Sequence, residues 1–239
     1  MSGPPRLKEE LRRVPLLGAA LTGAARIVRR RTFPGSQRYW ERHYARGGNS
    51  GEGSSGRLAL AKAQILNDFV ADNRVESVLE FGCGDGQQLA LAKYPRYLGL
   101  DVSVTTLRAT AARNAGDATK SFLRYDPDCF SDPAGWLTAD LVLSLDVIYH
   151  LVEDRIYRLH LRHVFASSTR YVVLFTSDAD RPIRTEHPTP HVRHRPVVRD
   201  VADAFPAWRL RERIPNPHPY QGVGTDTSFA DVYIYQRTR

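Results

Sequence analysis

The hydrophobic residues of this chain gather in short, mostly unbroken runs, and an acidic residue lies at or near the end of each of the first four. These runs cover residues 77–81, 97–100, 121–125 and 139–145, and the acidic residues are Glu80, Asp101, Asp126 and Asp146. Continuous apolar runs of this length are typical of strands buried on both faces of a parallel sheet. A fifth run covers residues 171–176, and helical patterns at 87–93, 104–114 and 153–165 separate the runs. We therefore predict an α/β fold whose carboxylates meet at one edge of the sheet.

The end of the chain predicts a β-hairpin. Residues 208–214 alternate between apolar and polar positions, residues 229–236 form a further strand, and a short helix near 197–205 precedes both. The proline-rich segment 215–219 cannot supply a crossover helix, so these two strands should pair antiparallel. With five parallel strands before it, the hairpin predicts a Rossmann-like sheet of seven strands, the last one antiparallel, with helices on both faces.

The first run leads into a glycine-rich turn that is typical of a nucleoside cofactor site. Gly82, Gly84 and Gly86 follow Glu80 at alternate positions, where glycine allows a tight turn and a close approach of the backbone to a ligand. A dinucleotide fingerprint would place its third glycine at position 87, where this chain has Gln87, so the spacing disfavours NAD.

Asp101 ends the second run. A carboxylate there can accept hydrogen bonds from both hydroxyls of a ribose. The alternative interpretation is that Asp101 caps the helix that follows, because aspartate is a good N-cap residue. The glycine turn upstream favours the ribose role.

Six segments together resemble the class I S-adenosylmethionine (SAM)-dependent methyltransferases, and within them a bacterial group of stand-alone enzymes. The segments are 39–41, 47–51, 80–86, 99–103, 145–154 and 191–195. Some members of that group act on sugar hydroxyls in actinobacterial polysaccharide synthesis, including the methylmannose polysaccharides. The resemblance covers residues 39–239 and implies one SAM-dependent methyltransferase domain, a saccharide acceptor and a divalent ion such as Mg²⁺, for which it assigns no ligands.

The resemblance also implies roles for individual residues. Glu80 and the glycines would hold the methionine part of the cofactor, Asp101 the ribose and Asp126 the adenine edge, while Ser144 and Leu145 would border the transferring methyl group. The expected cofactor-binding residues are therefore Tyr39, Glu80, Gly82, Gly84, Gly86, Asp101, Val102, Asp126, Ser144 and Leu145.

His150 is the candidate general base, with Asp146 beside it in the sequence. An alcohol acceptor must lose a proton, and a histidine just past a strand end can take it. Two alternatives remain open: His150 packs against the next helix, or a metal ion held by Asp146 activates the hydroxyl. Tyr149, His191 and His194 are the candidate acceptor-binding residues.

Residues 39–57 mix aromatic residues with glycines. This composition favours a lid that closes over the site and excludes water, and a flexible linker is the alternative. His187, His191 and His194 follow the fifth run among prolines. Three histidines could suggest zinc, but no cysteine or nearby carboxylate completes a set, so a basic loop facing the acceptor is the better hypothesis.

Residues 1–38 form a separate basic segment with apolar residues at near-helical spacing between Leu7 and Leu21. It is too short and too charged to cross a bilayer. It could pack on the domain or in a homodimer, or lie on a membrane surface as a peripheral contact. We expect a chain that begins near Gln37 to fold and bind the cofactor without it.

Composition adds little to this picture. The chain has 239 residues, a formal net charge of +8 and two cysteines without disulfide or zinc spacing; we expect a cytoplasmic protein. Its arginines are spread along the chain without a recognition motif, which disfavours a nucleic-acid partner and equally suits a small acidic acceptor.

Three functions compete at this stage. The first is O-methylation of a small, saccharide-like acceptor. The second is methylation of RNA or protein; the Asn/Asp-Pro-Pro-Tyr/Phe signature of amino-group DNA methylation is missing at residues 144–147. The third is a cofactor-binding regulator without enzymatic activity.

Overall fold

The computed structural model describes residues 33–181, 189–220 and 226–238. It divides the chain into two units, Met1–Pro34 and Gly35–Arg239, and the second unit carries every element described below. The amphipathic helix expected before residue 33 and the expected acceptor-loop residue His187 lie outside the described residues.

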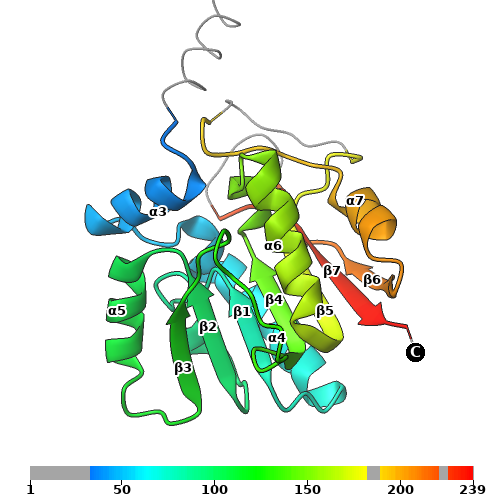
Figure 1. The fold of residues 1–239 in the computed structure, drawn as a ribbon, viewed down its shortest axis with the longest axis horizontal. Helices are drawn as coiled ribbons and strands as arrows, with labels where there is room; N and C mark the ends of the chain where they lie inside the picture. Colours follow the sequence, from blue (N-terminus) through cyan, green and yellow to red (C-terminus); the bar gives the residue numbers. More distant parts are fainter. Residues whose placement is uncertain (1–32, 182–188, 221–225, 239) are drawn as a thin grey trace, which may run out of the picture. The chain divides into compact units, whose positions relative to one another are not determined.

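A seven-stranded sheet forms the centre of the second unit, in the order β3-β2-β1-β4-β5-β7-β6 (Figure 1). β1 to β5 are parallel neighbours, and β7 inserts antiparallel between β5 and β6. The strands are β1 (Val78–Phe81), β2 (Tyr97–Asp101), β3 (Lys120–Arg124), β4 (Ala139–Leu145), β5 (Ser168–Thr176), β6 (Trp208–Ile214) and β7 (Asp231–Arg237). The predicted fold class and the antiparallel last strand are both confirmed.

Helices cover both faces of the sheet, as predicted. Leu66, Phe69 and Leu107 pack one face from α4 (Gly56–Asp72) and α5 (Val104–Arg113). Leu161 and Val201 pack the other from α6 (Asp154–Ala166) and α7 (Val197–Ala204). α3 (Ser36–Ala45) lies at the carboxyl-terminal edge of the strands (Figure 1). No helix within the described ranges combines the length and the apolar character needed to cross a bilayer.

Three elements differ from the sequence predictions. The helix expected at residues 87–93 is wrong: a single 3₁₀ turn, Leu89–Leu91, follows the glycine turn. The side chain of Asn67 donates to Leu91 O at 3.0 Å and accepts from Lys93 N at 2.8 Å, so it satisfies the backbone groups that a longer helix would pair. The other two are the helices α3 and α4, neither of which was predicted from the sequence.

Candidate active site

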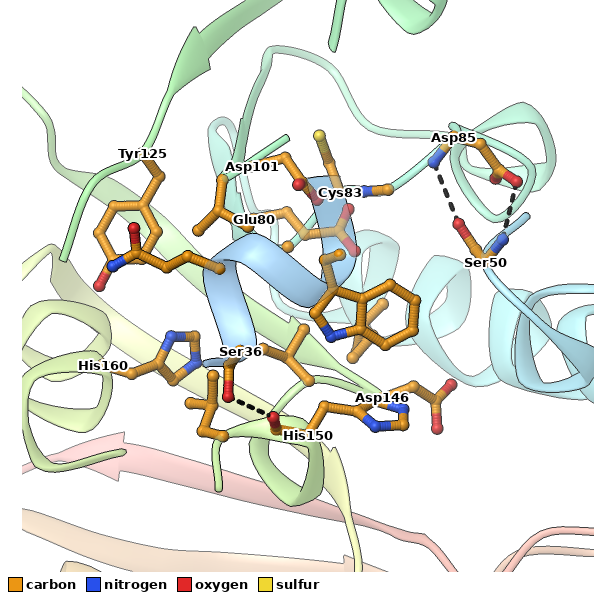
Figure 2. A pocket seen from close by; sticks show the side chains of 18 of the residues that line it. Ser36, Ser50, Glu80, Cys83, Asp85, Asp101, Tyr125, Asp146, His150 and His160 are labelled. Carbon is orange, nitrogen blue, oxygen red and sulfur yellow. Dashed lines mark hydrogen bonds between the residues drawn. The ribbon is translucent and has the colours of Figure 1, made fainter. Parts of the chain in front are cut away.

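A cavity lies at the carboxyl ends of the strands. Residues of α3 and of the segment after it form one wall, and the glycine turn, the ends of β2 and β4 and the start of α6 form the rest. Figure 2 shows Tyr125 and His160 at one end, Ser50 and Asp85 at the other, and Glu80 and Asp101 between them.

The cavity wall is acidic. Glu80, Asp85, Asp101 and Asp146 line it, whereas no lysine or arginine from the described part of the chain does. A ligand with net positive charge therefore fits the cavity better than an anion does.

The glycine turn shapes the floor of the cavity. Gly82 has φ 88° and Gly84 has φ 55°, a backbone region that side chains other than glycine rarely adopt. A Cβ on Gly82 would collide with Val147, and one on Gly84 would collide with Ser50 and come within 3.0 Å of the Tyr44 hydroxyl. These two glycines therefore let the turn pack closely against the segments that close the site.

Asp101 is buried and faces the turn. Its carboxylate accepts from Gly84 N at 2.9 Å and from Ser103 N at 2.8 Å. Ser103 is the N-cap of α5 and accepts from Thr106 N, so Ser103 and not Asp101 caps this helix. Burial raises the pKa of Asp101 to about 6.

Glu80 lies deeper, on the face of the sheet that α4 covers. Tyr97 Oη donates to it at 2.6 Å. Burial raises the pKa of Glu80 to about 7, opposed by the Tyr97 hydrogen bond and by the nearby Lys62 ammonium.

Asp146 is held by two internal donors. If the strand continued past Leu145, Asp146 would lie on the face of the sheet that α6 covers. Asp146 has a φ of 60°, which turns the chain. Its carboxylate therefore contacts Lys62 of α4 instead. Lys62 Nζ pairs with Oδ2, and Tyr149 Oη donates to Oδ1 at 2.6 Å. The Lys62 side chain is 1% exposed, so this is a buried ion pair in the cavity wall.

His150 lies in the 3₁₀ turn Ile148–His150 and lines the cavity. Its Nδ1 is 3.1 Å from His191 O, and because a carbonyl can only accept, Nδ1 carries the proton and Nε2 has the free lone pair. Nε2 has no hydrogen-bond partner within the described ranges. Burial lowers the pKa of His150 to about 4, so the ring is neutral at pH 7 and able to accept a proton.

Several residues of the 39–57 segment line the cavity, and α3 begins just before that segment. Ser36 anchors its start: Oγ donates to Glu153 Oε2 at 2.5 Å, and the Ser36 amide donates to Oε1 at 2.8 Å. Ser50 anchors the other end through a reciprocal pair with Asp85 (Figure 2), with Ser50 N to Oδ2 at 2.9 Å and Asp85 N to Ser50 Oγ at 3.0 Å. Trp40 and Tyr44 line the cavity between these anchors.

The fold around this cavity is similar to that of known structures. No protein-family model matches the sequence, and no curated protein matches it either. N-methyltransferase NodS from Bradyrhizobium japonicum WM9, in complex with S-adenosyl-L-homocysteine (SAH), is similar with a TM-score of 0.64 and 18% identity, over 86% of this chain and 100% of that chain. The chain has the class I methyltransferase fold.

Two further structures share this methyltransferase fold. Magnesium protoporphyrin IX methyltransferase (ChlM) from Synechocystis PCC 6803 with bound SAH has a TM-score of 0.57 and 14% identity, over 76% of this chain and 85% of that chain. Haemonchus contortus phosphoethanolamine N-methyltransferase 1 has a TM-score of 0.60 and 13% identity, over 88% of this chain and 49% of that chain. The names of these enzymes differ in acceptor, so the fold alone does not define one.

Eight of the predicted site residues line the cavity of this methyltransferase fold: Glu80, Gly82, Gly84, Asp101, Val102, Leu145, Asp146 and His150. The prediction thus gathered most of the cofactor set and both catalytic candidates at one place.

Four predicted cofactor residues lie outside the cavity lining. Gly86 packs against α5, where a Cβ would come within 2.7 Å of Thr110. Asp126 accepts from Asp128 N at 3.1 Å, and its neighbours Tyr125 and Pro127 line the cavity instead. Ser144 is buried under the wall, where its Oγ is 2.8 Å from His160 Nε2.

Tyr39, the fourth, belongs to an aromatic stack behind the cavity. Its ring stacks on His191 at 4.7 Å, and His191 stacks on His150 at 5.4 Å. The three predicted acceptor residues also lie outside the lining: His191 in this stack, Tyr149 bound to Asp146, and His194, whose Nδ1 is 2.7 Å from Ser177 Oγ. In this structure they support the wall and do not form it.

Several residues of the site were not predicted from the sequence. Ser36 and His160 line the cavity, and Lys62 pairs with Asp146 behind it. Lys62 did carry a signal, because it is a lone charge among apolar residues at helical spacing between Leu58 and Leu66.

The implied divalent ion does not fit this site. Both oxygens of Asp146 are already bound, one by the Lys62 ammonium and one by the Tyr149 hydroxyl. No group of three or more histidine, cysteine, aspartate or glutamate side chains in the described ranges could hold a metal ion. A cation at Asp146 would have to displace Lys62.

The cavity does fit SAM. Gln88 lines it and donates through Nε2 to Ala59 O at 3.2 Å, which leaves Gln88 Oε1 buried without a partner in the described chain. An unpaired buried acceptor is costly, and a ligand ammonium or N–H group would satisfy it. SAM carries a sulfonium and an ammonium against one carboxylate, so its net charge complements the acidic wall.

Proposed function

We propose that this protein transfers the methyl group of SAM to a hydroxyl group of a small acceptor, and that the acceptor is a saccharide. The observation that carries the SAM assignment is the acidic cavity beside the glycine turn: four carboxylates and no lysine or arginine among its described lining residues. The pyrophosphate of a dinucleotide would be repelled by that wall, whereas a sulfonium is attracted to it.

When bound, SAM supplies an activated methyl group. The described residues supply three other things. Asp101 has carboxylate capacity for ribose hydroxyls, α3 covers the reaction space, and the neutral Nε2 of His150 accepts the acceptor proton. Against the larger lowering by burial, the Asp146 carboxylate raises the pKa of His150, which favours the imidazolium that forms.

The position of α3 over the cavity supports a small acceptor. Trp40 of α3 lies edge-on to His150, with ring centroids 4.8 Å apart, and both line the cavity. An indole ring offers an apolar surface to the C–H groups of a sugar while the histidine contacts a hydroxyl. A folded RNA or protein would have to displace α3 to reach the same atoms.

The test supplies labelled SAM to the full chain with separated glycan, RNA and protein fractions. The proposal expects SAM binding and label in the glycan fraction only. Label in RNA or protein would overturn the acceptor class while retaining the methyltransferase. Absence of SAM binding would overturn the whole proposal.

A further inference from the structure

Tyr125 and His160 lie at the end of the cavity away from Ser50 and Asp85 (Figure 2). The apolar side chains of Val102, Pro127, Leu151 and Ile156 line the same cavity. The Tyr125 hydroxyl is already bound to His163 Nδ1 at 2.8 Å. A flat heterocycle fits between such apolar side chains, but its polar edge needs a hydrogen-bond partner.

His160 has one nitrogen available for that partner. Its Nε2 is 2.8 Å from Ser144 Oγ, and no other described residue bonds to either ring nitrogen. The Ser144 hydroxyl is fully buried and has His160 as its only hydrogen-bond partner in the described structure. Its proton therefore goes to Nε2, and the ring carries its own proton on Nδ1.

We propose that His160, fixed by Ser144, is the specificity-determining residue for the base of the cofactor, and that its Nδ1–H donates to a ring nitrogen of adenine. This inference rests on the proposed use of SAM. It assigns recognition of the base to His160 of α6. The residue expected from the sequence was Asp126, whose side chain does not line the cavity.

The protonation state of His160 supports this assignment. Burial lowers its pKa to about 3, and the neighbouring His163 adds to the shift. The ring is therefore neutral at pH 7, with a single donor at Nδ1 and no charge to be buried against an uncharged purine.

The experiment measures the affinity of the full chain for SAH and for three analogues that each remove one acceptor of the base. S-inosylhomocysteine converts N1 to N–H, and the 3-deaza and 7-deaza analogues replace N3 and N7 by C–H. We expect the wild type to bind one of the three at least ~10-fold more weakly than SAH, because a buried donor loses its partner. That analogue identifies the nitrogen that His160 contacts.

His160→Leu should reduce this preference to within about threefold, because the site no longer has an unpaired donor to penalise the analogue. Arg158→Leu is the control: it places the same new residue on the same helix, at an exposed position that does not line the cavity. It should keep the wild-type preference. Ser144→Ala removes the hydroxyl that fixes the proton of His160 on Nδ1. The preference for SAH over the analogue should then fall between those of the wild type and His160→Leu.

The outcomes separate the two proposals. If the wild type binds SAH and all three analogues alike, His160 does not read the base, whatever the variants do. A folded His160→Leu protein with the wild-type preference would overturn the inference as well, since a purely structural histidine leaves the ratio unchanged. If the wild type binds none of these ligands, the use of SAM fails instead.

Discussion

At the residue scale, burial sets the protonation state of the candidate base. His150 stays neutral from pH 7 down to about pH 4. Its pKa is lowered from 6.5 to about 4, chiefly because burial removes the ring from water. The cost is basicity, since a weaker base removes a proton less readily. The Asp146 carboxylate opposes this lowering and favours the imidazolium that forms.

We expect His150→Ala to lower turnover roughly 10²- to 10⁴-fold while cofactor affinity stays near the wild-type value, because only proton transfer is lost. The wild-type rate should fall as the pH drops through about 4, where His150 becomes protonated. Initial rates of label transfer across pH check both statements. A midpoint near 6.5, or near-normal turnover in the variant, would show that another group is the base.

Lys62→Met should be strongly destabilising. It leaves the Asp146 carboxylate, with 11% of its side chain exposed, without its counter-charge, and breaking a buried pair in this way costs about 3–5 kcal/mol. Adding Asp146→Asn removes the stranded charge and should recover part of the loss. Urea unfolding of the wild type, both single variants and the double variant measures the coupling. If the losses simply add, the pair is not coupled as the structure indicates.

These residues also show what the sequence could reveal. Glu80, Asp101 and Asp146 could be placed at one edge because strand direction alone brings them together. Their partners could not be predicted from local patterns. Lys62 is 84 positions from Asp146, and Ser36 is 117 from Glu153, so these contacts depend on how α4 and α3 pack against distant elements.

At the element scale, α3 is the part of the chain that closes the site. The structure places the start of the compact unit at Gly35 and anchors Ser36 to Glu153. A start near Gln37 would therefore remove an anchor of the lid. The hairpin of β6 and β7, by contrast, could be predicted from residues 208–236 alone, because the proline segment excludes a crossover.

We therefore expect a chain that begins at Gly35 to fold and bind SAH like the full chain, because the Ser36 anchor is intact. A chain that begins at Gly47 loses Trp40 and Tyr44 from the cavity wall, and we expect it to bind SAH at least ~10-fold more weakly. Calorimetric titration of both, with thermal melting to show that each is folded, checks this. Equal affinities would mean that α3 does not contribute to cofactor binding.

At the scale of the whole molecule, the charge of the cavity is opposite to that of the chain. The sequence carries a formal net charge of +8, while the four charged residues that line the cavity are all acidic among the residues described. An acidic cavity wall attracts a cationic cofactor. Composition could not reveal this separation, since it arises only when the strand ends converge.

This separation predicts a pH-dependent affinity for SAM. Burial raises the pKa of Glu80 to about 7 and that of Asp101 to about 6. Above pH 7 both carboxylates are ionised and attract the sulfonium; as the pH falls through 7 and then 6, both take up protons and the attraction is lost. We expect SAM affinity to fall about tenfold between pH 8 and pH 5.5, because one lost charge contact of about 1.4 kcal/mol has that effect.

The matched ligand is 5′-methylthioadenosine, which keeps the nucleoside but carries no charge. Its affinity should change far less over the same pH range, because only hydrogen bonds and apolar contacts hold it. Binding of SAM near pH 6.5 should also take protons off the protein, which calorimetry detects as a dependence of the binding heat on the ionisation enthalpy of the buffer. Parallel pH profiles for the two ligands would show that the buried carboxylates do not recognise the charge of the cofactor.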